Sequence, residues 1–237
     1  MKTVIIGDTH GRSFWKLITH LEKDADRFVF IGDYFDSFDI GTEDQCNNFL
    51  DIIEYKKTSS KEVVLLVGNH DIHYVTGNTG TSGYQQIGSF VICPIVNKNI
   101  HHLQMAYQFD NVLCTHAGVG ATFMDICFGK DGWKLETIAE QLNELWKYKP
   151  KSFEFNGMDS YGDNMGQTPV WIRPRSLMKD GLPFKKDIIQ VVGHTEQNQI
   201  DIKGKATGGR YYFIDTLGTS QEYLVVEDGV FKSKSCR

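Results

Sequence analysis

Several hydrophobic runs of this 237-residue chain end in short segments that carry aspartate, asparagine or histidine. Asp and Asn also gather at ordinary turns, so one such segment alone would indicate little. In a parallel sheet, however, the carboxyl ends of the strands meet at one edge, where α/β proteins bind their ligands. The repeated pattern therefore predicts a cluster of polar side chains at one sheet edge. The segments are Gly7-Asp8-Thr9-His10, Gly32-Asp33-Tyr34-Phe35-Asp36, Gly68-Asn69-His70-Asp71, Thr115-His116-Ala117-Gly118 and Gly193-His194-Thr195.

The apolar runs themselves predict an α/β fold. In the first third of the chain they are almost entirely apolar, as expected for strands that helices cover on both faces of a sheet. The last run leads into a hairpin turn over residues 227–230. The predicted strands are residues 4–6, 28–31, 63–67, 111–115, 188–192, 211–214 and 223–226.

Helices are predicted between these strands. One begins after Ser13 and places Leu17 and Ile18 on its apolar face. A second begins at Thr42, which is expected to form a capping box with Gln45. No internal repeat or linker interrupts the chain, so we expect a single domain over residues 1–237. The other predicted segments are a helix over residues 133–147 and polar loops over residues 73–90 and 149–167.

Composition excludes several classes of function. The formal net charge is −5, whereas a surface that follows nucleic-acid phosphates would make the domain basic. No apolar run approaches the length that spans a bilayer. Five scattered cysteines form no Cys-x-x-Cys pair, which is typical of reduced thiols. We therefore expect a cytoplasmic protein that binds neither nucleic acid nor membranes.

The residue types in the polar segments favour metal chemistry. Carboxylate and amide oxygens combined with imidazole nitrogens suit Mn, Fe or Zn, and we expect manganese first. Two such ions that share a carboxylate can clamp a phosphoryl group and lower the pKa of a bridging water. His70 would then protonate the leaving group, and Asp36 would hold its other ring nitrogen. The segments thus predict a two-metal phosphoesterase.

The same segments resemble the signature of calcineurin-like metallophosphoesterases, which runs Asp-x-His, Gly-Asp-x-x-Asp, Gly-Asn-His-Asp/Glu, His, Gly-His. Gly193-His194-Thr195-Glu196 is similar to the ending of the phosphoprotein phosphatase branch, which includes Ser/Thr protein phosphatases and symmetrical dinucleoside tetraphosphatases. Trp171-Ile172-Arg173 resembles a segment of bacterial and phage members. The resemblance implies a four-layer α/β/β/α sandwich with two mixed sheets.

The resemblance further implies which residues bind two divalent metal ions. The carboxylate of Asp33 would bridge the two ions. Asn69 would bind one of them and also contact the substrate. The implied ligands are Asp8 and His10 on the first metal, Asp33 on both, and Asn69, His116 and His194 on the second.

The catalytic residues implied by the resemblance are the acid pair of His70 and Asp36, together with Arg173, which would bind the substrate phosphate. His73 is close to His70 in sequence, but we do not expect it to line the pocket.

One departure from the branch pattern concerns phosphate binding. The branch usually has Asp-Arg-Gly where this chain has Asp36-Ser37-Phe38. The missing arginine would normally make a charge-assisted hydrogen bond to a phosphoryl oxygen. Arg12 and Arg175 are the candidates to replace it, because a guanidinium matches the geometry of phosphate.

Three functions remain open from the sequence. The leading one is hydrolysis of phosphomonoesters by a Ser/Thr-type protein phosphatase, through a metal-bridging hydroxide and a histidine general acid. The first alternative is hydrolysis of a dinucleoside polyphosphate or a phosphodiester, and the second is a metal-binding scaffold without turnover. The expected partner is a phosphorylated protein, or a small phosphate ester or nucleotide. The loops over residues 73–90 and 149–167 would select the substrate, and the sequence does not indicate an oligomeric state.

Overall fold

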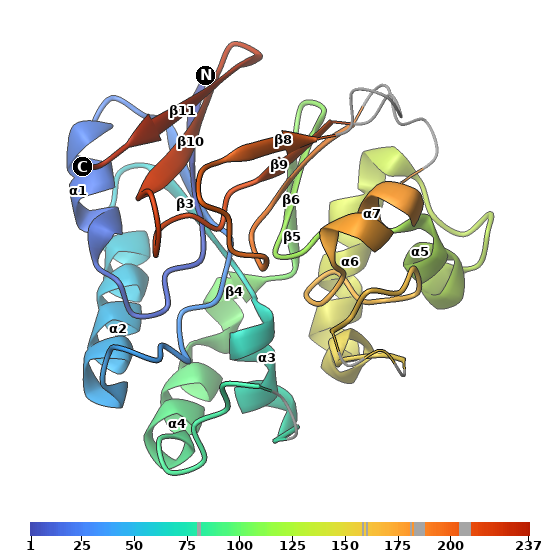
Figure 1. Cartoon of the computed structure of the whole chain (residues 1–237), viewed down its shortest axis with the longest axis horizontal. Coiled ribbons are helices and arrows are strands. Elements are labelled where there is room, and N and C mark those ends of the chain that lie inside the picture. Colours follow the sequence, from blue (N-terminus) through green and yellow to red (C-terminus); the bar gives the residue numbers. More distant parts are fainter. Residues whose placement is uncertain (80–81, 158, 160, 181, 183–187, 204–209) are drawn as a thin grey trace.

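The computed structural model describes residues 1–79, 82–157, 159, 161–180, 182, 188–203 and 210–237 (Figure 1). Its strands are β1 (Lys2–Ile6), β2 (Arg27–Phe30), β3 (Glu62–Leu66), β4 (Leu103–Gln104), β5 (Ala106–Phe109), β6 (Val112–Thr115), β7 (Ile189–Val192), β8 (Asp201–Lys203), β9 (Arg210–Phe213), β10 (Glu222–Glu227) and β11 (Val230–Ser235). Its helices are α1 (Phe14–Leu21), α2 (Thr42–Thr58), α3 (Asn69–Thr76), α4 (Ser89–Asn99), α5 (Ala121–Phe128), α6 (Ile138–Tyr148) and α7 (Pro174–Asp180). Short 3₁₀ turns cover Ile100–His102, Leu135–Thr137 and Pro150–Phe153.

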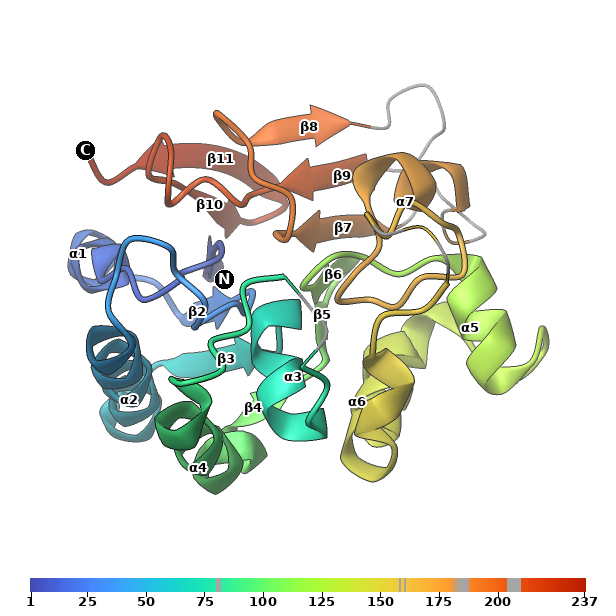
Figure 2. The same cartoon turned by 60° about the horizontal axis from the view of Figure 1, so that its bottom comes forward.

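The strands form two mixed sheets (Figure 2). The first has the order β11-β10-β1-β2-β3-β4, in which β1 to β4 are parallel and β10 and β11 are antiparallel additions. The second has the order β5-β6-β7-β9-β8, with a parallel centre and an antiparallel strand at each edge. Both sheets therefore agree with the mixed architecture expected from the sequence.

The alternation of side chains along the strands explains the layers. Val4 and Ile6 pack into the cluster that includes α1 and α2, whereas Ile5 between them faces the second sheet. In Figure 1, α1 and α2 lie on the left of the strands and α5, α6 and α7 on the right. The result is the predicted α/β/β/α sandwich. The residues between the sheets include Ile5, Val29, Ile31, Val64, Leu66, Val112, Cys114, Val191, Tyr212 and Ile214.

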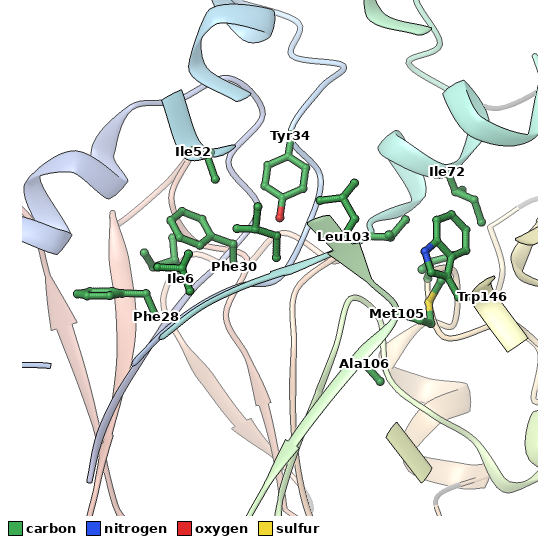
Figure 3. Packing of buried hydrophobic residues seen from close by; sticks show 14 of the residues in the cluster. Ile6, Phe28, Phe30, Tyr34, Ile52, Ile72, Leu103, Met105, Ala106 and Trp146 are labelled. Carbon is green, nitrogen blue, oxygen red and sulfur yellow. The ribbon is translucent and has the colours of Figure 1, made fainter. Parts of the chain in front are cut away.

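The largest apolar cluster joins the first sheet to the helices around it (Figure 3). Phe28 and Phe30 of β2 lie beneath Ile52 of α2. On the other side of the same view, Trp146 of α6 packs near Met105. All five side chains are at most 7% exposed, so this cluster anchors helices from both parts of the chain.

The local predictions for the start of α2 and for the loop before α4 are wrong. The expected capping box does not form, because Gly41 is the N-cap of α2 and Thr42 already lies inside the helix, where its hydroxyl donates to Gln85 Oε1. The expected loop over residues 73–90 is shorter than predicted, since α3 extends to Thr76 and α4 begins at Ser89. Gln45 is used elsewhere: its side chain accepts from the backbone of Ser37.

The ends of the central strands converge on one edge of the sandwich. The parallel strands β1, β2 and β3 of the first sheet and β6, β7 and β9 of the second all run toward this edge. Each is followed within three residues by a polar side chain. None of the helices that the structure describes is both long and apolar enough to cross a lipid bilayer.

The first helix offers a test of the packing. Ile18 is completely buried, whereas the adjacent Leu17, which was predicted to share its apolar face, is 43% exposed. Ile18→Ala should lower the free energy of unfolding by about 2–5 kcal/mol through the cavity it leaves. Leu17→Ala should cost about 1 kcal/mol or less. Urea unfolding of the two variants measures the difference, and equal losses would contradict the described orientation of α1.

Candidate active site

The loops that follow the strands hold site residues in a strained backbone conformation. Four non-glycine residues have positive φ angles here: His10 (42°), Asp33 (53°), Asp36 (61°) and His194 (66°). L-residues adopt this left-handed region at a cost, and such residues cluster at functional sites. The backbone N–H of His10 donates to Asp33 O at 2.7 Å, so the loops after β1 and β2 support each other.

Two glycines allow the carboxylates to approach these loops. A Cβ atom on Gly68 would lie 2.0 Å from Asp33 Oδ1, and one on Gly193 would lie 1.9 Å from Asp8 Oδ1. Any side chain at either position would therefore displace an aspartate. This explains why a glycine precedes Asn69 and His194 in the polar segments.

Asp8, His10 and Asp33 form one group of potential metal ligands. One donor atom from each of the three lies within 4.8 Å of the others. His10 Nδ1 donates to the backbone oxygen of Phe35 at 2.6 Å, which leaves Nε2 facing Asp33 Oδ2 at 3.6 Å. Asp8 Oδ2 accepts from the backbone of His194 at 2.9 Å, whereas the buried Oδ1 has no hydrogen-bond partner among the described residues. An orphaned buried carboxylate oxygen is costly without a cation.

Asn69, His116 and His194 form a second group. Asn69 Oδ1 lies 2.8 Å from His116 Nε2 and 2.7 Å from His194 Nδ1. The opposite ring nitrogens contact backbone oxygens, His116 Nδ1 that of Ile31 at 3.0 Å and His194 Nε2 that of Trp171 at 3.1 Å. A carbonyl oxygen can only accept a hydrogen bond, so these contacts fix which nitrogen carries the proton.

The three histidines share one arrangement. Each donates one ring N–H to a backbone carbonyl, and in the neutral imidazole the other nitrogen then presents a lone pair. These lone pairs face oxygens: His116 Nε2, for example, also lies 3.3 Å from Asp33 Oδ2. Burial lowers the pKa of His10 and lowers that of His194 well below the usual value, which favours the neutral ring in both. Lone pairs of nitrogen and oxygen that face one another fit a cation bound between them. Metal-binding histidines commonly donate their other ring N–H to a backbone carbonyl, as these three do.

The acid pair lies beside these groups. His70 Nδ1 donates to Asp36 Oδ2 at 2.9 Å, and the backbone N–H of His70 donates to Asp33 Oδ1 at 2.8 Å. Burial favours the neutral form of His70, but the charges of Asp33 and Asp36 outweigh it and raise its pKa to about 9. His73 Nε2 lies 2.8 Å from Asp36 Oδ2, and the hydroxyl of Tyr74 donates to Asp36 Oδ1.

Asp71 has a role that the sequence did not suggest. Its buried carboxylate accepts three backbone hydrogen bonds, from Asp33 at 2.9 Å, Tyr34 at 2.8 Å and Gly68 at 2.8 Å. It therefore joins the loop after β2 to the start of α3. The neighbouring residues contact different loops, since His70 contacts Asp36 after β2 and Asn69 contacts His116 and His194 after β6 and β7.

These groups open into a cavity of about 440 Å³. Arg173 lies in it and is fixed by its Nε, which donates to Tyr161 O at 2.8 Å, and by Nη1, which donates to Thr195 Oγ1 at 3.1 Å. Arg12 also lines the cavity and donates to Asp39 at 3.1 Å. The lining residues are Asp8, His10, Arg12, Asp36, Ser37, Phe38, Asp39, His70, Arg173, His194, Glu196, Asp215 and Gly218.

The two arginines proposed to replace the missing one differ in position. Arg12 faces the cavity, but the side chain of Arg175 is 90% exposed and is not among the lining residues. Its nearest charged partner is Asp163, at 3.9 Å. Arg175 is the second residue of α7 and is exposed to solvent, so the structure does not place it with the other site residues. Ser37 and Phe38 lie on the cavity rim, and Phe38 is 90% exposed.

Asp215 lines the cavity although the sequence analysis did not select it. It follows β9 by two residues, so the strand-end rule that selected the candidate ligands could have selected it too. Burial, with the negative charge of Asp33, raises the pKa of Asp215 to about 7. This carboxylate adds to the negative charge that faces Asp8.

Comparison with solved structures agrees with this architecture. The cold-active protein-tyrosine phosphatase of a psychrophilic Shewanella sp. aligns with a TM-score of 0.65 at 15% identity, over 99% of this chain and 78% of that chain. A protein serine/threonine phosphatase from Saccharomyces cerevisiae with similarity to human phosphatase PP5 aligns with a TM-score of 0.57 at 16% identity, over 99% of this chain and 80% of that chain. At these identities the likeness shows the fold.

The sequence comparisons supply the family. A search of curated proteins found no significant match. A family model for calcineurin-like phosphoesterases, in contrast, matches residues 1–217, a range that contains every polar segment described above. The chain therefore belongs to the calcineurin-like phosphoesterase family and is a hydrolase of phosphate esters.

Proposed function

We propose that this protein is a two-metal phosphomonoesterase of the phosphoprotein phosphatase type. One observation carries the proposal: three buried or half-buried histidines each donate a ring N–H to a backbone carbonyl and turn the other nitrogen toward a carboxylate or amide oxygen. Without positive charge between them, these atoms would repel each other. Divalent cations satisfy such a set of acceptors.

The ligand atoms divide between two ions as the family resemblance implies. Asp8 and His10 serve one ion, Asn69, His116 and His194 serve the other, and Asp33 lies between the two groups. Oxygen and imidazole donors without thiolate favour manganese, with iron or zinc as alternatives. When bound, two such ions would lower the pKa of an attacking water and neutralise charge on the phosphoryl group.

The chain's own residues supply proton transfer and phosphate binding. Because Asp36 holds Nδ1 of His70, the nitrogen available to the substrate is Nε2. As the attacking oxygen forms its bond to phosphorus, the bond to the leaving oxygen breaks, and that oxygen takes the proton from Nε2. Arg173, and Arg12 once it turns from Asp39, would bind the phosphoryl oxygens.

Other functions fit less well. A scaffold without turnover has no need of a buried acid pair, and here His70 and Asp36 are held together beside every predicted ligand. Hydrolysis of a dinucleoside polyphosphate or phosphodiester remains a second candidate, because Phe38 exposes an aromatic face on the cavity rim where a base could stack.

All five cysteines lie in the described residues and none is paired, which fits the predicted cytoplasmic location.

Metal removal tests the proposal. Protein stripped of metal by a chelator should release no phosphate from p-nitrophenyl phosphate, and added Mn²⁺ should restore turnover. Mg²⁺ at the same concentration, which prefers oxygen ligands and binds imidazole only weakly, serves as the control. Turnover that persists without metal, or its absence at every Mn²⁺ concentration, would contradict the proposal.

The bridging position makes a prediction about two aspartates. Asp33→Asn should reduce Mn²⁺-dependent activity more than Asp8→Asn, because a bridging carboxylate serves both ions whereas Asp8 serves one. The bound metal of each purified variant, measured by atomic emission, should fall in the same order. Equal metal content and equal rates in the two variants would contradict the assignment of Asp33 as the bridge.

Substrate class is tested with a panel under the same conditions. A phosphoserine peptide should be hydrolysed faster than bis(p-nitrophenyl) phosphate or a dinucleoside tetraphosphate. His70→Asn should reduce the rate on the phosphoserine peptide by about 10²–10⁴-fold, the range expected for loss of a general acid. Rapid release of mononucleotides from the dinucleotide, with slow turnover of monoesters, would favour the second candidate instead.

A further inference from the structure

One face of α3 carries three side chains that all contact Asp36. His70, His73 and Tyr74 are spaced by three and four residues and therefore lie on the same side of the helix. His70 and His73 approach Asp36 Oδ2 at 2.9 Å and 2.8 Å, and the Tyr74 hydroxyl donates to the other oxygen, Oδ1. The side chain of Asp36 is completely buried. Both oxygens of this carboxylate are thus held from α3.

The hydroxyl of Tyr74 is oriented by a second hydrogen bond. The backbone N–H of Gln85 donates to the Tyr74 oxygen at 3.2 Å. Because that hydrogen bond uses an oxygen lone pair, the hydroxyl proton is directed to Asp36 Oδ1. The side chain of Gln85 is itself held by Thr42, whose hydroxyl donates to it at 2.6 Å. Gln85 thus connects α2 to Tyr74, through one hydrogen bond of its side chain and another of its backbone.

Aromatic packing closes the same region. The ring of Tyr84 stacks on Tyr74 with a centroid distance of 5.2 Å and an interplanar angle of 27°, and it meets the edge of His73 at 5.1 Å. Gly83 lies against the acid, because a Cβ atom there would be 2.8 Å from His70 Cε1. His73 and Tyr74 are only 1% and 2% exposed. His73, Tyr74 and Tyr84 therefore pack together beside the acid pair.

We propose that Tyr74, assisted by His73, is a positioning residue for the general acid. By fixing both oxygens of Asp36, the two side chains hold the His70 ring at the angle that directs Nε2 to the leaving oxygen. This inference rests on the proposed function, because it assumes that His70 is the acid. Asp36 has left-handed backbone geometry with φ of 61°, so it needs such support to keep one orientation.

The dependence of rate on the leaving group separates positioning from a structural role. p-Nitrophenolate is a weak base and departs without a proton, whereas the alkoxide of a serine or glycerol ester needs one. A change that misplaces the acid therefore slows alkyl esters and spares nitrophenyl esters. A change that merely loosens the fold or the metal ligands slows both kinds of ester alike.

The experiment compares two variants that each remove one hydroxyl. Tyr74→Phe should reduce kcat/KM for a phosphoserine peptide about tenfold, as for other residues that orient an active group, and for p-nitrophenyl phosphate about twofold or less. Tyr84→Phe keeps the stacked ring and removes a hydroxyl that makes no hydrogen bond to Asp36 in the described part of the chain, so both rates should stay unchanged. Equal losses on both substrates in Tyr74→Phe, or no loss, would overturn the proposal.

His73 is tested by a second pair of variants. His73→Leu removes the ring nitrogen near Asp36, whereas His73→Gln keeps an N–H donor at similar reach. The selective loss on the phosphoserine peptide should appear in the leucine variant and be at least partly restored in the glutamine variant. Identical profiles for the two would remove His73 from the proposal and leave Tyr74 alone.

Proton NMR of the metal-free protein gives a readout that does not depend on turnover. The Nδ1 proton of His70, hydrogen-bonded to Asp36, should give a low-field signal that exchanges slowly with water and is absent in His70→Asn. In Tyr74→Phe this signal should broaden or exchange faster, and in Tyr84→Phe it should persist. An unchanged signal in Tyr74→Phe would overturn the positioning role. Absence of Mn²⁺-dependent turnover in the wild-type protein would contradict the proposed function. The NMR comparison would still show whether Tyr74 supports the hydrogen bond between His70 and Asp36.

Discussion

The buried carboxylate of Asp33 lies where the loops after several strands of both sheets meet. Its Oδ1 accepts from the backbone of His70, and its Oδ2 lies 3.6 Å from His10 and 3.3 Å from His116. Burial alone would raise the pKa of Asp33, whereas positive charge at His116 and the other facing ring nitrogens would hold the pKa well below its usual range. The surrounding atoms are mostly acceptors, so the arrangement depends on attraction to positive charge.

The fold places these acceptors together at a conformational cost. Parallel strands bring the loops to one edge, and the loops then turn through left-handed residues such as His10, Asp36 and His194. Glycines at 68 and 193 remove the Cβ atoms that would collide with the aspartates. The left-handed backbone conformations persist because the ends of the loops are held fixed. The two sheets and the helices outside them pack through large apolar clusters and provide this support.

The candidate metal ligands could be grouped from the sequence because each follows an apolar strand, and parallel strands bring such residues to one edge of the sheet. The sequence could not place Arg175, since nothing in Trp171-Ile172-Arg173 shows which of two arginines at the start of α7 faces the cavity. Asp215 obeys the same strand-end rule and was simply not selected. The contacts of Tyr74 with Asp36 and Gln85 join distant segments, and no local pattern predicts them. Similarly, Gln45 caps no helix because it holds the loop at Ser37.

The central claim is that the facing acceptors bind two cations. Anomalous diffraction from crystals grown with Mn²⁺ tests it most directly, because the signal locates each ion without reference to activity. The account predicts two peaks, one contacted by Asp8, His10 and Asp33 and the other by Asp33, Asn69, His116 and His194. A single peak would contradict the bridging role of Asp33, and the absence of any peak at these residues would contradict the claim altogether.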